Sequence, residues 1–367
     1  MTNKLRTLEV ADAPLFIGAD SLAELAAQLS DKLKDRSPIF ILTDKNTSQY
    51  CLPILLDQVP ELKNACNLVV EAGEENKTIQ TCETLWNQLA LLGANRGSIL
   101  INLGGGVISD MGGFVASTFH RGMSYINIPT TLMSMIDAAI GGKTGVDLAS
   151  LKNMVGLISN PLGVYVWPEF LKTLPFRYLL SGYAEMMKHA IIADAHFWKK
   201  LTITPMAVIT AWDDLIYRAA EIKCKIVSSD HHEKGPRRLL NFGHTIGHAF
   251  ETYSLRKDSS PISHGEAVAM GMICASYISY RNCNLPLSQR DEIIRNVMLN
   301  FDHYNIETAA IEEILEITVY DKKNRNGKVI MTLIPEIGTA IHGQNVDISL
   351  IRESLFRYTD FRRYVIR

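Results

Sequence analysis

The first half of the chain alternates short apolar runs with longer stretches in which apolar residues recur every three or four positions. The short runs predict strands at Leu15–Ile17, Ile39–Leu42, Leu68–Glu71, Ile99–Leu103 and Tyr125–Ile128. The longer stretches predict helices over 21–33, 48–56, 78–92 and 110–119. Strands that alternate with helices indicate an α/β, Rossmann-like doubly wound parallel sheet, which binds ligands outside the carboxyl ends of its strands.

From about residue 176 the pattern becomes helical, and Pro175 marks the expected boundary. The 367 residues are enough for two domains. We expect an α/β domain over 1–175 and an all-α domain over 176–367.

Composition narrows the class of partner. A formal charge of -2 argues against nucleic acid as the main ligand. The six cysteines show no CxxC spacing, which is typical of reduced core thiols in a cytoplasmic protein. The chain has no apolar run long enough to span a membrane, so we expect a soluble protein with no membrane partner.

Polar residues follow four of the predicted strands. Asp44 and Asn46 follow the second strand, and a carboxylate there suits ribose hydroxyls. Glu74 and Lys77 follow the third, and Thr130 and Thr131 the fifth. The fourth is followed by Gly104-Gly105-Gly106, a run that suits a pyrophosphate at a helix N-terminus. The glycines alone would equally suit a tight turn, but the four strand ends together favour a nucleotide crevice.

The segment from Asp137 to Asp147 is rich in glycine and predicts a loop whose backbone is exposed to a ligand. Lys143 lies in this segment, and Lys152 and Asn153 follow it. Two lysines and an amide suit phosphate or carboxylate oxygens, although a solvated surface loop explains the same residues equally well.

Three histidines suggest a metal site in the second half. His244 and His248 lie one helical turn apart, and His264 precedes an apolar run that predicts the next helix. Glu185 lies on a helix of Ala, Met and Ile residues, so its buried carboxylate needs a partner such as a metal ion. His189, four residues after Glu185, is a rival ligand. Together these features indicate a nicotinamide-dependent, metal-assisted reaction on a small anionic alcohol.

The motifs as a set resemble those of 3-dehydroquinate synthase, a family within the sugar-phosphate cyclases. The similarity covers nearly the whole chain in order. The matching segments are Gly104 to Asp110, Arg121 to Thr131, Asp137 to Lys143, Lys152-Asn153, Ala184 to Lys188, Asn241 to His248 and His264 to Ala267.

The resemblance implies conversion of 3-deoxy-D-arabino-heptulosonate 7-phosphate to 3-dehydroquinate and phosphate, a step of the shikimate pathway. It implies catalytic NAD and a divalent zinc or cobalt ion bound by Glu185, His244 and His264. It also implies a homodimer, because Arg121 resembles an arginine that reaches the neighbouring subunit's site.

The remaining roles follow from the same resemblance. The residues expected to contact NAD are Asp44, Asn46, Glu74, Lys77, Gly105, Gly106, Val107, Ile108, Ser109, Asp110, Thr130, Thr131, Lys143, Lys152 and Thr173. The residues expected to hold the anionic sugar phosphate are Asp137, Lys143, Lys152, Asn153, Lys188, Lys223, Arg237, Asn241 and His248, together with Lys322 or Lys323.

Several positions depart from the family pattern, namely Tyr178, His189, His231, His232 and Pro236. They leave open a cyclase that acts on a different sugar phosphate. The motifs are also compatible with a metal-dependent polyol dehydrogenase of the same fold, and the strand ends alone with a non-catalytic nucleotide-binding protein.

Overall fold

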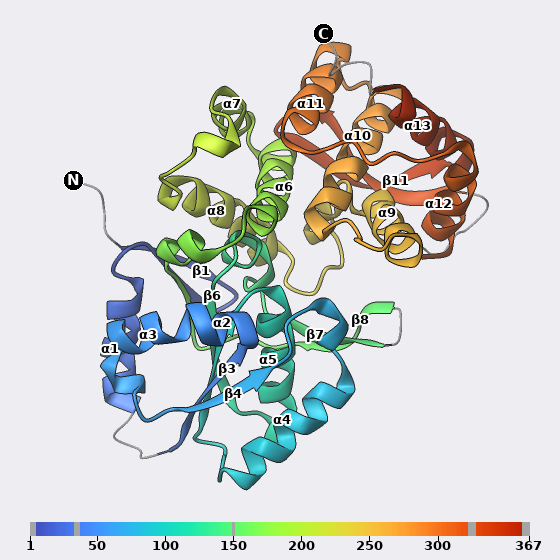
Figure 1. Ribbon diagram of the computed structural model, residues 1–367. Coiled ribbons are helices and arrows are strands. Elements are labelled where there is room, and N and C mark those ends of the chain that lie inside the picture. The colour runs from blue at the N-terminus through green and yellow to red at the C-terminus, as the bar shows by residue number, and fades with distance from the viewer. Residues whose placement is uncertain (1–4, 33–36, 149–150, 322–327, 362–367) are drawn as a thin grey trace. The chain divides into compact units, whose positions relative to one another are not determined.

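The computed structural model describes residues 5–32, 37–148, 151–321 and 328–361 (Figure 1). The chain divides into two compact units, one of residues 1–175 with 211–231 and one of residues 176–210 with 232–367. The division differs from the predicted domains at Ala211–His231, which belong to the first unit because helix α8 (Asp213–Ser229) packs on β1 and on the turn at Ser134–Ala138.

A seven-stranded sheet forms the centre of the first unit. Its strand order is β1-β2-β9-β6-β5-β3-β4, and every neighbouring pair except β1 and β2 is parallel. The strands are β1 (Arg6–Val10), β2 (Ala13–Ile17), β3 (Ile39–Asp44), β4 (Cys66–Val70), β5 (Ile99–Gly104), β6 (Ser124–Pro129) and β9 (Val164–Val166). The predicted doubly wound α/β class is therefore confirmed, and the carboxyl ends of β6, β5, β3 and β4 lie along one edge of the sheet.

Helices cover the sheet and bury its apolar strands. They are α1 (Ser21–Lys32), α2 (Lys45–Tyr50), α3 (Leu52–Gln58), α4 (Ile79–Leu91) and α5 (Gly106–Thr118), with short 3-10 turns at Pro60–Leu62, Glu74–Asn76, Phe119–Arg121 and Pro168–Thr173. Leu42 on β3, Leu100 on β5 and Val115 on α5 are fully buried in one core with Val146. Helix α5 begins four residues before its predicted start, so it follows β5 with only Gly105 between them.

The glycine-rich segment after β6 is only partly the loop that we predicted, because Gly141 and Gly142 lie in an irregular connection but the residues on either side are regular. Ser134–Ala138 forms a π-helical turn, and β7 (Lys143–Leu148) pairs antiparallel with β8 (Leu151–Ile158). Gly145 lies opposite Gly156, and a Cβ on Gly156 would come within 2.2 Å of the Thr144 carbonyl oxygen. These glycines permit close strand pairing, a role that composition alone does not separate from loop formation.

The second unit is mainly helical, as predicted. Its helices are α6 (Phe176–Ala193), α7 (Ala195–Ile203), α9 (His244–Lys257), α10 (His264–Asn282), α11 (Leu287–Asn300), α12 (Thr308–Asp321) and α13 (Ile348–Asp360), with 3-10 turns at Met206–Val208 and Pro236–Asn241. It is not entirely α-helical, because β10 (Lys328–Glu336) and β11 (Thr339–Asp347) form a hairpin that contacts α10, α6 and α13 (Figure 1).

Glycines bring α6, α9 and α10 unusually close together. A Cβ on Gly271 of α10 would lie 1.9 Å from the carbonyl oxygen of Gly243, at the start of α9. A Cβ on Gly265 would lie 2.2 Å from the carbonyl oxygen of Ser181 on α6. Ser181 Oγ also accepts a 2.9 Å hydrogen bond from the Gly265 N–H. The three helices can therefore place side chains from their facing ends in one small volume.

No helix in the part of the chain that the structure describes is both long and apolar enough to cross a bilayer.

We expect Gly271→Ala to destabilise the protein, because the new Cβ has no space beside the Gly243 carbonyl oxygen. Overpacking of this kind costs about 1–3 kcal/mol. Urea unfolding of the cofactor-free protein measures this difference. Gly106→Ala is the control, because its Cβ would lie 3.3 Å from its nearest neighbour, Ala138 Cβ. Equal stability of the two variants would contradict the packing argument.

Candidate active site

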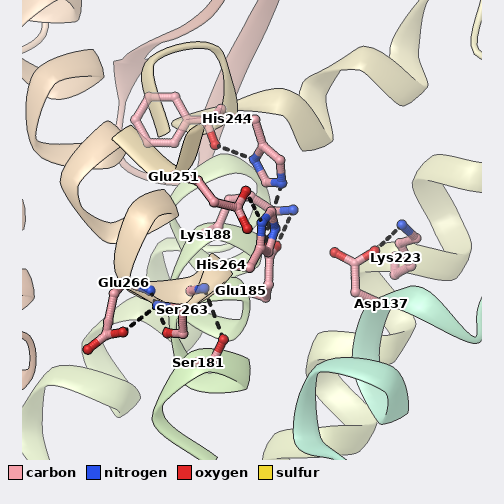
Figure 2. Close-up of polar contacts among 12 residues, drawn as sticks. Asp137, Ser181, Glu185, Lys188, Lys223, His244, Glu251, Ser263, His264 and Glu266 are labelled. Carbon is pink, nitrogen blue, oxygen red and sulfur yellow. Dashed lines mark hydrogen bonds and ion pairs between the residues drawn. The ribbon is translucent and has the colours of Figure 1, made fainter. Parts of the chain in front are cut away.

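Glu185 lies at the centre of a buried polar cluster in the second unit (Figure 2). Its side chain is 2% exposed, and Lys188, one turn further along α6, contacts its Oε2 atom. Its Oε1 atom faces two imidazoles, with His244 Nε2 at 3.4 Å and His264 Nε2 at 3.5 Å. A carboxylate buried to this extent needs such compensation.

His244 is the first residue of α9, and the backbone around it sets the direction of its ring. Gly243, immediately before it, has a positive φ of 79°, a conformation that glycine adopts easily. His244 Nδ1 lies 3.2 Å from the carbonyl oxygen of Phe242. A proton on Nδ1 satisfies that oxygen and leaves the Nε2 lone pair directed at Glu185.

His264 is the first residue of α10 and is fixed in a similar way. Ser263 and Glu266 form a capping box that defines the start of this helix. His264 Nδ1 lies 3.2 Å from Oε2 of Glu251, which comes from α9 and is 5% exposed. A histidine that donates one ring N–H to a carboxylate and presents the other nitrogen is the usual arrangement at a metal site.

The geometry and charge of the cluster fit a divalent cation. In a tetrahedral zinc site with bonds of about 2.1 Å, neighbouring ligand atoms lie roughly 3.4 Å apart, and the two Glu185–His distances match this value. Burial alone would raise the pKa of Glu185, but Lys188, His244 and His264 hold that pKa well below its usual range. Burial lowers the pKa of His244, which favours the neutral form that binds metals.

His248 belongs to the same group of imidazoles. Its ring centroid lies 5.3 Å from that of His244 and 5.7 Å from that of His264. The nitrogens of the three histidines come within 4.8 Å of one another, so His248 is geometrically able to serve as a ligand as well. Because Glu185 Oε1 lies at ligand spacing from both His244 and His264, we keep these three as the predicted ligands, and His248 stays a predicted substrate residue.

In the first unit, the predicted nucleotide residues gather at the carboxyl edge of the sheet. Gly105 is the N-cap residue of α5. It has no side chain, so it makes no side-chain hydrogen bond to the N-terminal N–H groups of the helix. A Cβ on Gly105 would lie 3.0 Å from Thr131 Cγ2, and Thr130 N–H donates to the Gly104 carbonyl oxygen. Thr130 and Thr173 both lie against the Cys51 thiol. The edge thus brings together three segments that are distant in sequence.

Asp44 has a structural role that we did not predict. Its Oδ1 atom accepts the Thr47 N–H at 2.8 Å, and Thr47 Oγ1 accepts the Asp44 N–H at 3.0 Å. This reciprocal capping explains why α2 begins at Lys45 rather than at the predicted Ser48.

Lys77 links several of the predicted site residues. Its Nζ atom donates to Asp110 Oδ2 at 2.7 Å and to Asn153 Oδ1 at 2.6 Å, and it lies 3.7 Å from Glu74. Lys152 Nζ lies 4.0 Å from the same Glu74 carboxylate. Burial would lower the pKa of Lys77, but Asp110 and Glu74 raise it, so the amine stays charged at neutral pH.

Other predicted substrate residues also have defined surroundings. Lys223 on α8 contacts Asp137 in the first unit (Figure 2). In the second unit Arg237 is buried, and Asn241 Nδ2 donates to Glu233 Oε1 at 3.2 Å. Glu233 was not predicted as a site residue. Its positive φ of 56° is a local signal of an unusual role, and this signal is not visible in the sequence.

The remaining predicted residues are more exposed or undescribed. Asn46, Lys143 and Arg121 are exposed on the first unit, and Arg121 has a positive φ of 64°. Lys322 and Lys323 lie outside the described residues.

Comparison with known proteins decides the family. The model of the 3-dehydroquinate synthase N-terminal domain matches residues 67–181, and that of the C-terminal domain matches residues 182–324. The chain belongs to the 3-dehydroquinate synthase family. The resemblance found from the motifs is thereby confirmed.

Named members of the 3-dehydroquinate synthase family are similar over most of the chain. The protein from Parabacteroides distasonis is 38% identical over 96% of this chain and 99% of its own length. The protein from Campylobacter jejuni is 38% identical over 84% of this chain and 89% of its own length. Both carry the name 3-dehydroquinate synthase.

Solved structures of related cyclases share the fold of this 3-dehydroquinate synthase family member. A 2-deoxy-scyllo-inosose synthase complexed with carbaglucose-6-phosphate, NAD+ and Co2+ has a TM-score of 0.84 and 24% identity, over 97% of this chain and 99% of that one. A 2-epi-5-epi-valiolone synthase from Streptomyces hygroscopicus with NAD+ and Zn2+ bound has a TM-score of 0.78 and 26% identity, over the same shares.

The contact between Glu251 and His264 generates a test of the metal site. We expect Glu251→Gln to weaken zinc or cobalt binding by about 10- to 100-fold, because the partner that orients the His264 ring loses its charge. Competition with a chromophoric chelator measures the affinity.

Glu266→Gln is the matched control, because Glu266 lies near the same helix start but contacts Ser263 and Arg177 instead. Unchanged metal affinity in Glu251→Gln, or an equal loss in both variants, would contradict this role.

Proposed function

We propose that this protein is a 3-dehydroquinate synthase of the shikimate pathway. It would convert 3-deoxy-D-arabino-heptulosonate 7-phosphate to 3-dehydroquinate and phosphate by transient oxidation, phosphate elimination, reduction and intramolecular aldol closure. Membership of the family, with named relatives at 38% identity over most of the chain, supports the reaction.

The observation that carries the proposal is the convergence of Glu185, His244 and His264 on one point, with Lys188 beside them. In the proposal these three residues hold a zinc or cobalt ion, and the first unit holds NAD. The metal would polarise a substrate oxygen, and NAD would take up hydride and return it.

The chain's own residues would bind and orient an anionic substrate. Lys188 keeps Glu185 ionised, and in the proposal its ammonium group also neutralises a substrate oxygen. Lys223, Arg237, Lys143 and Lys152 supply further positive charge for a carboxylate and a phosphate group. A substrate held in one conformer by these cations can use its own phosphate in proton transfer, which reduces the acid–base chemistry required of the protein.

The nucleotide half of the proposal depends on the sheet edge of the first unit. The uncapped N-terminus of α5 suits the pyrophosphate, and the adjacent Thr130 and Thr131 hydroxyls suit the remaining polar groups of a dinucleotide. Asp44, Asn46, Glu74, Lys77 and Thr173 complete the proposed NAD set. Asp44 would keep the capping bond between its Oδ1 atom and the Thr47 N–H and use its other carboxylate oxygen for ribose.

Two further parts of the proposal concern assembly and location. We propose a homodimer in which Arg121, exposed on a left-handed turn, reaches the partner's site. The described cysteines are free thiols, which is typical of a reducing compartment and supports a cytoplasmic location.

Phosphate release from the heptulosonate phosphate tests this function. With NAD and Zn2+ or Co2+ supplied, we expect phosphate and 3-dehydroquinate in equal amounts and no net NADH, measured by absorbance at the nicotinamide wavelength. Turnover of sedoheptulose 7-phosphate instead would indicate another cyclase, and net NADH from a polyol would indicate a dehydrogenase.

Glu185→Gln keeps the volume of the side chain and removes its charge. We expect it to lower kcat by about 10³-fold or more, because a metal ligand contributes several kcal/mol to the barrier. Glu312→Gln, an exposed acid on α12 that pairs with Arg352, should retain full activity. Circular dichroism checks that both variants are folded, and an active, metal-free Glu185→Gln protein would reject the assignment.

A further inference from the structure

The hairpin of β7 and β8 contains an irregularity at the position where it carries predicted site residues. The strands pair regularly from Lys143 with Ile158 to Val146 with Val155, and then Leu148 pairs with Leu151. One residue of β7, Asp147, therefore faces the three residues Lys152–Met154 of β8. A bulge of this kind re-aims side chains and leaves backbone groups outside the strand ladder.

The backbone of Asn153 shows the consequence of the bulge. Its φ is 55°, in the left-handed region that asparagine tolerates better than most residues. Its N–H donates to Asp147 Oδ1 at 2.7 Å. The Asp147 side chain thus takes the place of the β7 backbone carbonyl that a regular ladder would offer to this N–H.

Asp147 and Asn153 close a hydrogen-bonded ring with Lys77. The Asp147 N–H donates to the Lys77 carbonyl oxygen at 2.9 Å, and Lys77 Nζ donates to Asn153 Oδ1 at 2.6 Å. Lys77 is 2% exposed and also contacts Asp110 on α5. Both the backbone and the side chain of Asn153 are consequently fixed.

The ring stands on a rigid base within the first unit. Helix α5 packs directly on β7, and a Cβ on Gly113 of α5 would lie 2.5 Å from Thr144 Cγ2. Val146, next to Asp147, is fully buried in the core. The bulge is therefore held from the β7 side, while Lys152 and Asn153 of β8 are exposed.

We propose that Asp147 is a positioning residue, which holds the bulge of β8 so that Asn153 and Lys152 are presented to the phosphorylated substrate. The inference rests on the proposed function for the substrate, but the bulge itself is independent of it. A solvated surface turn would not need a left-handed residue whose N–H and side chain are both bound to fixed partners.

Kinetics of three variants test the inference. Asp147→Ala removes the acceptor and should lower kcat/KM by about 10- to 100-fold, the effect expected for a lost hydrogen bond to a charged group. Asp147→Asn keeps an oxygen that can accept the Asn153 N–H, so it should stay within about threefold of the parent protein. The losses in the double variant Asp147→Ala/Asn153→Ala should be less than additive, because Asp147 acts in part through the Asn153 side chain.

Additive losses in the double variant would overturn the inference, as would an Asp147→Ala protein that is fully active or that loses activity only in proportion to unfolded protein. Met154→Ala is the control, because Met154 lies next to Asn153 but is exposed and outside the ring. It should match the parent protein.

Hydrogen exchange of the cofactor-free protein separates this inference from the proposed function. The amides of Leu151–Ile158 should exchange about 10- to 100-fold faster in Asp147→Ala than in Asp147→Asn, with no change in β5 or β6. A parent protein that does not release phosphate would reject the proposed function but not the role of Asp147 in holding the bulge. Unchanged exchange in β8 would reject the role of Asp147 in holding the bulge, whatever the activity.

Discussion

Burial of the Glu185 carboxylate is the constraint on which the second unit depends. A charge that is 2% exposed is costly unless opposite charge and hydrogen-bond donors surround it. Lys188 supplies part of this compensation from the same helix, and His244 and His264 must come from two others. This requirement explains the glycines at the helix contacts, since α10 could not lie against α6 if Gly265 carried a side chain, nor against the start of α9 if Gly271 did.

The same arrangement explains how the imidazoles come to present Nε2 rather than Nδ1. Each Nδ1 has a local acceptor, the Phe242 carbonyl oxygen for His244 and the Glu251 carboxylate for His264. Both acceptors belong to α9 or to the residues before it, so one helix orients both rings. Burial would lower the pKa of His264, but the contacts with Glu185 and Glu251 outweigh it and raise this pKa to about 10. A cation at Nε2 would therefore compete with a proton. Metal binding and proton release are therefore linked at this cluster.

The sequence was most informative where chemistry and periodicity coincide. The alternation of strands and helices predicted the sheet edge. The one-turn spacing of His244 and His248, together with the apolar neighbours of Glu185, predicted the cluster of the second unit. It was least informative at β7 and β8, where Gly145 and Gly156 serve close strand pairing but resemble loop glycines. Glu251, Glu233 and Asp147 were missed because each acts through a contact, with His264, Asn241 and Asn153 respectively, that only the folded chain creates.

The first unit shows that several predicted ligand contacts also have structural partners. Asp44 caps α2, and Lys77 joins Asp110 to Asn153. Such residues could serve the ligand, the fold or both, and sequence patterns alone do not separate these roles. The hydrogen-bond geometry does separate them for Asp147, whose carboxylate accepts a backbone N–H of the bulge that it faces. In the proposed role, the contribution of Asp147 to substrate recognition passes through the residues that it holds.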